Sequence, residues 1–204
     1  VFLAGDAAHL MPPFMGQGMC AGIRDVSNLA WKIAYCLNHK HSEKLLNTYQ
    51  SERFSNVKEY IKTTVRMGEF VNAIGTSNIT GEVSSTPDGQ KSMKSIKPKL
   101  GKGLGKIQDK NRGQIFPQFI TKNKKVLDKK FSLRPILILS EEINKNFSNK
   151  INFIKSKEIK NLNYFFKKTK SKAVIVRPDR FILSSCKSIK DFKSYLSKNL
   201  SILV

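Results

Sequence analysis

The spacing of apolar residues predicts one strand and two long helices in the first third of the chain. The run Val1–Ala4 is apolar and stops at a Gly-Asp pair, as a buried parallel strand would. From about residue 17 to residue 37, apolar residues recur three and four positions apart and form one helical face, with Arg24, Asp25 and Lys32 off it. This face consists of Ile23, Val26, Ala30, Ile33 and Leu37.

A second helix is expected to begin at about Ser42, a suitable N-cap residue with Glu43 in the first turn. Its apolar pattern weakens between Gly68 and Gly75. The apolar positions are Leu45, Tyr49, Val57, Ile61 and Val65.

Residues 76–130 have the composition of a linker or extended loop, because Gly, Ser, Lys and Pro dominate. They include Gly-x-Gly-x-Gly at 101–105, a pattern that could suggest a phosphate cradle. No clear strand leads into these glycines, no amphipathic helix follows, and no Gly-x-x-x-x-Gly-Lys-Ser/Thr motif is present. We therefore do not expect phosphate binding there.

Residues 131–204 return to alternating strands and helices, which indicates a small α/β domain. The last two of its four expected strands are joined by a tight turn at 177–179. The strands are expected at Pro135–Leu139, Ile151–Ile154, Ala173–Val176 and Arg180–Leu183, and the helices at about 141–149, 158–168 and 188–199.

Charge and cysteine content narrow the class of protein. The 204 residues hold 37 Lys and Arg against 15 Asp and Glu, a net charge of +22, and nearly all of the excess lies after residue 75. We interpret it as a solvated Lys-rich surface, with salt-sensitive phosphate-backbone binding as the alternative.

No apolar run reaches the roughly 18 residues of a membrane span. The cysteines, Cys20, Cys36 and Cys186, form no Cys-x-x-Cys pair, so we expect no metal site and a cytoplasmic location.

The stretch from Gly5 to Asp25 has the chemistry of a ligand site. Asp6 follows the expected strand, where open α/β sheets bind ligands, and its carboxylate can accept hydrogen bonds from a polyol. After a Pro-Pro corner, Gly16 and Gly18 let the backbone approach a flat ligand at a helix start, whose N–H groups stabilise negative charge. A polyol joined to a planar, anion-forming ring describes a flavin.

The order Gly-Asp, His, Pro-Pro, Gly-x-Gly and Asn-Leu-Ala-Trp-Lys resembles the flavin motif of the FAD-dependent aromatic hydroxylases, the para-hydroxybenzoate hydroxylase-like flavoprotein monooxygenases. The resemblance covers residues 1 to about 55, and Tyr49–Arg53 is similar to the family's Tyr-x-x-Glu-Arg. Within this family, the sequence of the motif is most similar to that of the hydroxyphenylpropionate and phenol-type hydroxylases. Gly113–Gln118 and Val176–Arg180 are similar to their Gly-x-Leu-Phe-Pro-Gln and Val-Arg-Pro-Asp segments.

The resemblance implies specific contacts to FAD. Asp6 would bind the ribityl chain, and Gly5 would make the turn before it. Pro12 would wall the flavin beside the substrate, and Pro13 would have a catalytic role by offering its carbonyl to the substrate or to the peroxyflavin. The remaining contacts are backbone contacts to the pyrimidine edge of the flavin, from Gly16, Gly18, Met19 and Cys20.

Some positions depart from the family or have no assigned chemistry. Cys20 stands where the family usually has Asn, so a side-chain contact to the flavin would be missing. Ser55 replaces a usual Pro. We expect His9 to organise the turn. Proton transfer by His9 is the alternative. A thioredoxin-like domain here would lack a redox pair, because Cys186 stands alone.

The resemblance implies an α/β fold with three parts: the C-terminal part of a Rossmann-like FAD domain (1–75), a linker (76–130) and a small thioredoxin-like domain (131–204). The family's Gly-x-Gly-x-x-Gly unit for the ADP half of FAD and its substrate-binding sheet are not in this sequence. We therefore expect a C-terminal fragment that is inactive alone.

The implied reaction of the intact enzyme is hydroxylation of a small phenolic substrate. NADH or NADPH would reduce FAD, and O2 would give a C4a-hydroperoxyflavin that transfers one oxygen atom to the ring. We expect no nucleic-acid partner and no membrane span, and a homo-oligomer stays open. The alternative is a non-catalytic module whose basic second half binds a partner subunit, nucleic acid or an anionic surface.

Overall fold

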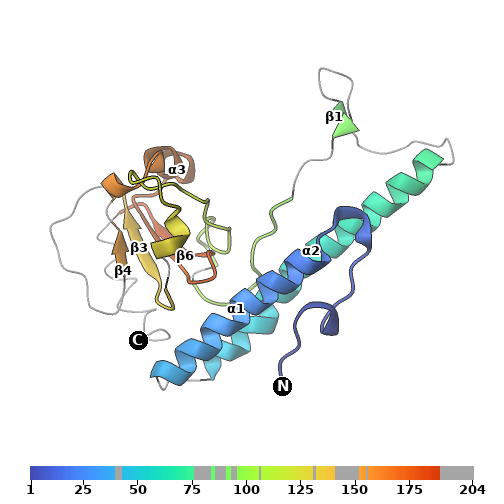
Figure 1. Ribbon diagram of the computed structural model, residues 1–204, viewed down its shortest axis with the longest axis horizontal. Helices are drawn as coiled ribbons and strands as arrows, with labels where there is room; N and C mark the ends of the chain where they lie inside the picture. Colours follow the sequence, from blue (N-terminus) through green and yellow to red (C-terminus); the bar gives the residue numbers. More distant parts are fainter. Residues whose placement is uncertain are drawn as a thin grey trace.

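The computed structural model describes residues 1–39, 43–75, 84–85, 91–92, 96–105, 107–130, 132–140, 152–154 and 156–188. Two long helices, α1 (Gly18–His39) and α2 (Lys44–Gly75), run antiparallel and side by side. The N-terminal segment, which precedes α1, lies alongside them (Figure 1). A small sheet with its own helix packs against this helix pair. The expected N-cap at Ser42 lies outside the described residues.

Both predicted helices are present, but α1 buries the face opposite to the expected one. Ile23, Val26 and Leu37, from the predicted apolar face, are 57%, 55% and 78% exposed, whereas Asp25 and Lys32 are 1% and 0% exposed. The buried charges are tolerated because each forms an ion pair with a residue of α2. Aromatic side chains on the same face supply the apolar contacts.

The predicted strand at Val1–Ala4 is not formed, so the prediction of a strand there is wrong. A strand needs a neighbour to complete its hydrogen bonds, and none of the described strands pairs with these residues. The segment is instead held by Tyr49 of α2, whose hydroxyl donates to the Leu3 carbonyl at 2.7 Å. The Tyr49 ring also makes an edge contact with Phe2.

The sheet has the order β4-β3-β5-β6, with β3 parallel to β4 and the other neighbours antiparallel. All four strands lie at or next to their predicted positions. Their bounds are β3 Ile136–Leu139, β4 Asn152–Ile154, β5 Ala173–Val176 and β6 Ile182–Cys186. A separate antiparallel pair consists of β1 (Ser84–Ser85) and β2 (Lys91–Ser92).

Of the three helices expected around this sheet, one is described. It is α3 (Leu162–Thr169), which begins later than the predicted residue 158 because a 3-10 turn occupies Ser156–Glu158. The helix predicted at 141–149 lies outside the described residues, as does all but the first residue of the one at 188–199.

The sheet is buried on both faces, which explains its continuous apolar runs. In β3, Leu137 and Leu139 pack towards Trp31 and Tyr35 of α1. The alternate residues of β3 pack towards α3. The sheet therefore forms the layer between the helix pair and α3.

The described residues of the range 96–130, which leave out residue 106, are mostly irregular and include a 3-10 helix at Leu127–Lys130. They also contribute to the core, because Leu100, Leu104, Phe116 and Leu127 are buried. The predicted domain boundaries at 75 and 130 stay predictions.

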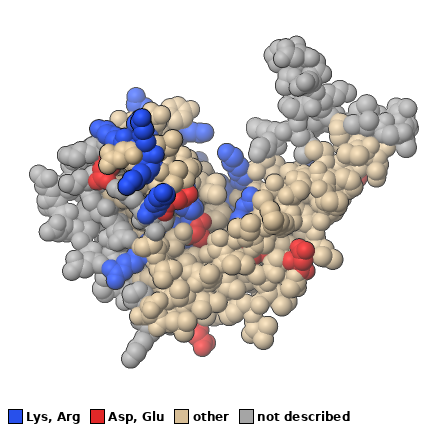
Figure 2. Space-filling view, in the orientation of Figure 1, with Lys and Arg blue, Asp and Glu red and all other residues tan. Residues whose placement is uncertain are grey.

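On the face of the molecule shown in Figure 2, Lys and Arg side chains gather over the sheet part. Few of them lie over the helix pair on that face. No helix in the described part of the chain is long and apolar enough to cross a membrane. A search of the same residues finds no group of three His, Cys, Asp or Glu side chains that could hold a metal ion.

Candidate functional site

The predicted ligand site begins with a turn that rests on α1. Gly5 opens a short 3-10 helix, Gly5–Ala7, with φ at +60°, a left-handed conformation that glycine adopts without strain. A Cβ added to Gly22 of α1 would lie 3.2 Å from the Gly5 Cα, so the backbone of the turn at Gly5 is in close contact with α1. Asp6 follows at the surface, with its side chain exposed.

The Pro-Pro corner forms a second short turn, Pro13–Met15, with Pro12 as its N-cap. Gly16 ends it at φ +59°, and the Gly16 N–H donates to the Pro13 carbonyl at 2.9 Å. One acceptor position of that carbonyl, the group with the implied catalytic role, is therefore used within the turn. The Phe14 ring lies against Gly68 of α2, where an added Cβ would come within 2.3 Å of the ring.

The helix α1 starts with open space before its first turn. An added Cβ at Gly16 or Gly18 would meet no atom within 4 Å. Met19 is 75% exposed and Cys20 is half-buried. The first N–H groups of a helix have no partner within the helix, so this end can bind an anion or an electron-rich ring edge.

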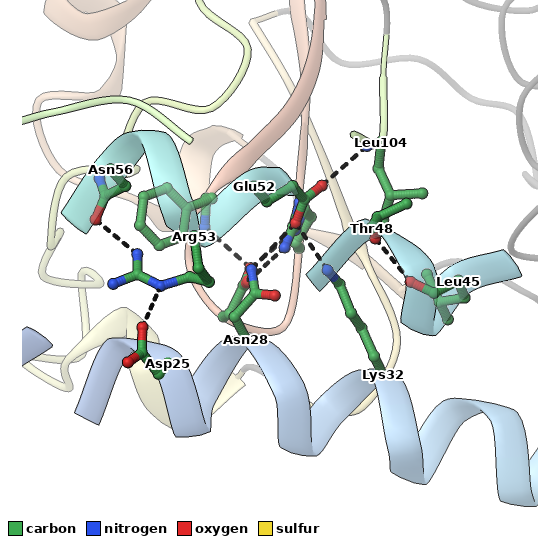
Figure 3. Close-up of polar contacts among 12 residues, drawn as sticks. Asp25, Asn28, Lys32, Leu45, Thr48, Glu52, Arg53, Asn56 and Leu104 are labelled. Atoms are coloured by element: carbon green, nitrogen blue, oxygen red, sulfur yellow. Dashed lines mark hydrogen bonds and ion pairs between the residues drawn. The ribbon is translucent and has the colours of Figure 1, made fainter. Parts of the chain in front are cut away.

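Asp25 fixes the first turn to the helix pair. Its Oδ2 accepts a hydrogen bond from the Gly5 N–H at 3.0 Å and lies 2.6 Å from His9 Nε2. Its Oδ1 accepts from Arg53 Nε at 2.7 Å (Figure 3). Arg53 in turn donates to Asn56 at 2.6 Å. His9 thus has a partner that the sequence did not indicate, in accord with a role in organising the turn.

Glu52, the preceding residue of the Tyr-x-x-Glu-Arg motif, binds groups on the other side of α2. Its Oε1 accepts from Arg177 Nη1 at 2.8 Å and from the Leu104 N–H at 2.9 Å. Its Oε2 accepts from Lys32 Nζ at 2.8 Å and from Asn28 Nδ2 at 3.1 Å. Figure 3 shows the α1 side chains reaching Glu52 from the facing helix. Glu52 is fully buried, and both oxygens are satisfied.

Arg177 and Asp179, from the Val-Arg-Pro-Asp segment, complete this second cluster. Arg177 makes a two-pronged contact with Asp179, Nε to Oδ1 at 3.0 Å and Nη2 to Oδ2 at 2.6 Å. Its guanidinium lies 5.2 Å from the centre of the Trp31 ring. Asn28 also donates to Asp179, at 3.0 Å. Two motifs whose residues Glu52 and Arg177 are 125 positions apart in the sequence therefore meet in the core.

Burial by itself would raise the pKa of Glu52, but the charges and hydrogen bonds of Arg177 and Lys32 outweigh it and lower the pKa from 4.5 to about 2. For Lys32, burial is the strongest influence and lowers the pKa to about 8, although Glu52 raises it. Both groups are therefore charged between these two values.

The Gly-x-Gly-x-Gly segment packs over this cluster. The Gly101 N–H donates to the Glu52 carbonyl at 2.8 Å, and a Cβ on Gly101 would lie 2.2 Å from the Ser51 carbonyl oxygen. A Cβ on Gly103 would come within 2.3 Å of the Glu52 side chain. At these two positions glycine is needed for close packing on α2.

A groove of about 680 Å³ opens between the N-terminal segment and α2. His9, Asp25 and Arg53 line its polar part, and apolar residues such as Phe54 and Val57 line the rest. None of the predicted flavin contacts lines this groove.

Comparison with known proteins bears on this site. Residues 1–64 match the model of a family described as "FAD binding domain". The chain is 38% identical over 122 residues to a probable NADH-specific resorcinol 4-hydroxylase of Rhodococcus jostii, an alignment that covers 58% of the chain and 22% of that relative. It is 52% identical over 68 residues to a 3-(3-hydroxy-phenyl)propionate/3-hydroxycinnamic acid hydroxylase of Klebsiella pneumoniae, covering 33% of the chain and 12% of the relative.

Solved structures share the fold. The anhydrotetracycline hydroxylase OxyS of Streptomyces rimosus aligns with 99% of the chain and 44% of its own length, with a TM-score of 0.64 and 17% identity. Aklavinone-11 hydroxylase, solved with FAD and aklavinone, aligns with 98% of the chain and 43% of its own length, with a TM-score of 0.60 and 18% identity. The chain thus spans less than half the length of these proteins. These findings confirm that the chain resembles the FAD-dependent aromatic hydroxylases, through a flavin-domain segment at residues 1–64.

Proposed function

We propose that this chain supplies the flavin-ring side of an FAD-dependent monooxygenase that hydroxylates small phenolic compounds. The observation that carries the proposal is the Gly5 turn. It is fixed on α1 by the Gly22 contact and the Asp25 hydrogen bond, beside a helix start with open space at Gly16 and Gly18. An exposed carboxylate next to an open, glycine-lined helix N-terminus suits a polyol attached to a flat ring.

The residues of the chain fit FAD at this place. Asp6 would accept hydrogen bonds from the ribityl hydroxyls. Pro12 and Pro13 would form a wall beside the ring, and the second acceptor position of the Pro13 carbonyl would be left for the substrate. The ring's pyrimidine edge would meet backbone N–H groups, from Gly16, Gly18, Met19 and Cys20. Bound FAD would supply the oxygen-transferring chemistry that amino-acid side chains lack.

The electron donor and substrate class are inferred from the relatives. The name of the Rhodococcus jostii relative specifies NADH, which favours NADH over NADPH here. Both named relatives act on hydroxylated aromatic rings, so we propose a phenolic substrate with O2 as the second substrate.

We also propose that the sheet part is a thioredoxin-like domain. Its support is the topology: a parallel pair, β3 and β4, followed by α3 and an antiparallel pair, β5 and β6, with β3 next to β5. This part would be structural, because its Cys186 has no second cysteine three positions away and so no Cys-x-x-Cys pair. The three cysteines form no disulfide, which favours a cytoplasmic location.

The test is titration of the 204-residue chain with FMN, followed by NMR of the backbone amides at millimolar protein, where weak binding is visible. We expect shifts confined to Gly5, Asp6 and the Gly16–Cys20 segment. Inorganic phosphate is the control, because the lysines attract any anion. Shifts spread over the lysines of the sheet part, equal for FMN and phosphate, would contradict the proposal and favour a basic interaction module.

Two variants refine this titration. Asp6→Ala should weaken FMN binding about thirtyfold, because it removes charge-assisted hydrogen bonds worth about 2 kcal/mol. Cys20→Ala should change it little, because the backbone N–H that would contact the ring stays. Equal losses in the two variants would show that the role given to the backbone at Cys20 is wrong.

A further inference from the structure

Asp25 has no part in the motif-based description of the site, yet it is a buried carboxylate with an unusual set of partners. It is 1% exposed and is contacted by three separate segments of the chain: the Gly5 turn, the loop at His9 and the helix α2. A buried carboxylate is costly unless it is paired and hydrogen-bonded, and here both oxygens have partners.

The two oxygens of Asp25 connect different parts. Oδ1 is bound to Arg53, whose guanidinium is itself held by Asn56 and is 3.5 Å from the Ala21 carbonyl of α1. Oδ2 is bound to both ends of the turn, the Gly5 N–H and the His9 ring. The carboxylate therefore ties the short 3-10 turn to the helix pair.

Asp6 comes directly after the anchored Gly5 N–H and before His9, so its position depends on both contacts. The Gly5 backbone is already in the left-handed conformation and touches Gly22, which leaves little room for a shifted turn. A change at Asp25 releases both ends of the turn at once. A change at Asp6 itself leaves the turn in place.

We propose that Asp25 is a positioning residue for flavin binding, which holds Asp6 in reach of the ribityl chain through the Gly5 N–H and His9. The inference rests on the proposed function, because it assigns Asp25 a role in that same site. Arg53 is the cation paired with the Asp25 carboxylate, and its Nε–H donor orients that carboxylate.

The experiment compares Asp25→Asn with Glu52→Gln in the 204-residue chain. Both variants neutralise a buried carboxylate that pairs with a buried cation, so Glu52→Gln controls for the loss of a buried charge as such. The readouts are the backbone amide shifts of Gly5 and Asp6 without ligand and the FMN titration. We expect Asp25→Asn to shift both amides and to weaken FMN binding about tenfold. Glu52→Gln should leave both readouts as in the wild type.

A milder variant covers the case in which Asp25→Asn does not fold. His9→Ala removes one of the two contacts to the turn and keeps the Asp25–Arg53 ion pair, so the fold should survive. It should shift the Gly5 and Asp6 amides in the same direction by a smaller amount and weaken FMN binding about threefold.

The outcomes separate the inference from the proposed function. Unchanged Gly5 and Asp6 amides in Asp25→Asn and His9→Ala would overturn the inference, as would equal FMN losses in Asp25→Asn and Glu52→Gln. A wild-type chain whose amides do not respond to FMN would instead contradict the proposed function, while the ligand-free amide shifts would still report whether Asp25 positions the turn.

Discussion

Two buried carboxylate clusters share the helix pair but connect it to different partners. Asp25 binds Arg53 and holds the N-terminal turn, whereas Glu52 binds Arg177 and holds the sheet part. The α2 residues involved, Glu52 and Arg53, are neighbours in one sequence motif. Two adjacent charges in one motif thus need not form one site: consecutive helical residues point about 100° apart, so each can bind a different neighbour.

The clusters also differ in their charge balance. The Glu52 cluster holds two carboxylates and two cations, and all of these groups are buried at the junction of helix pair and sheet. The Asp25 cluster lies at the edge, where His9 retains 14% side-chain exposure. The inner cluster should therefore govern the stability of the fold, and the outer cluster should govern the geometry of the candidate flavin site.

The largest expected effect is the loss of the inner carboxylate. Glu52→Ala leaves Lys32 and Arg177 buried without their shared partner, so the free energy of unfolding should fall by about 3–5 kcal/mol. Urea denaturation followed by circular dichroism measures it. Glu59→Ala, which removes an exposed carboxylate from the same helix, should change the free energy by less than about 0.5 kcal/mol. Similar losses for the two variants would contradict the role of the inner cluster.

Acid should weaken the inner cluster next. The pKa of Glu52 is lowered to about 2 in the folded chain from 4.5, so its stabilising contribution is complete above pH 4.5 and is lost as the pH falls towards 2. The difference corresponds to about 3 kcal/mol. Urea denaturation at pH values about one unit apart, from about 5.5 down to about 2.5, should show this decline. Glu52→Gln should flatten it, and an equally steep decline in that variant would assign the acid sensitivity to other carboxyl groups.

Much of the fold follows from local patterns, but the burial of α1 does not. The spacing of apolar residues correctly predicts both helices, and apolar runs locate β3 to β6. The same spacing chooses the wrong face of α1, because side chains such as Asp25 and Lys32 are buried only through partners that are distant in the sequence. Their spacing with Asn28, three and four positions apart, forms a polar stripe along one helical face, and this stripe was the available signal.

The candidate site was predictable in part for the same reason. The Gly-Asp, Pro-Pro and Gly-x-Gly residues could be proposed from the sequence because their chemistry is local to one short stretch. The anchoring of the turn by Asp25 could not, because it depends on how α1 and α2 pack. The packing role of Gly103 could not be predicted from the sequence either. A Cβ on Gly103 would come within 2.3 Å of the Glu52 side chain, a contact that only the structure shows.

Hydrogen exchange of the backbone amides in Glu52→Gln and Arg53→Gln tests the division between the two clusters most directly. Glu52→Gln should speed exchange at Leu104 and in the β5–β6 hairpin and leave Gly5 to His9 unchanged. Arg53→Gln should speed exchange at Gly5 to His9 and leave the hairpin unchanged. If both variants speed exchange in both regions to the same extent, the two residues belong to one cooperative unit, and the account of two separate clusters is contradicted.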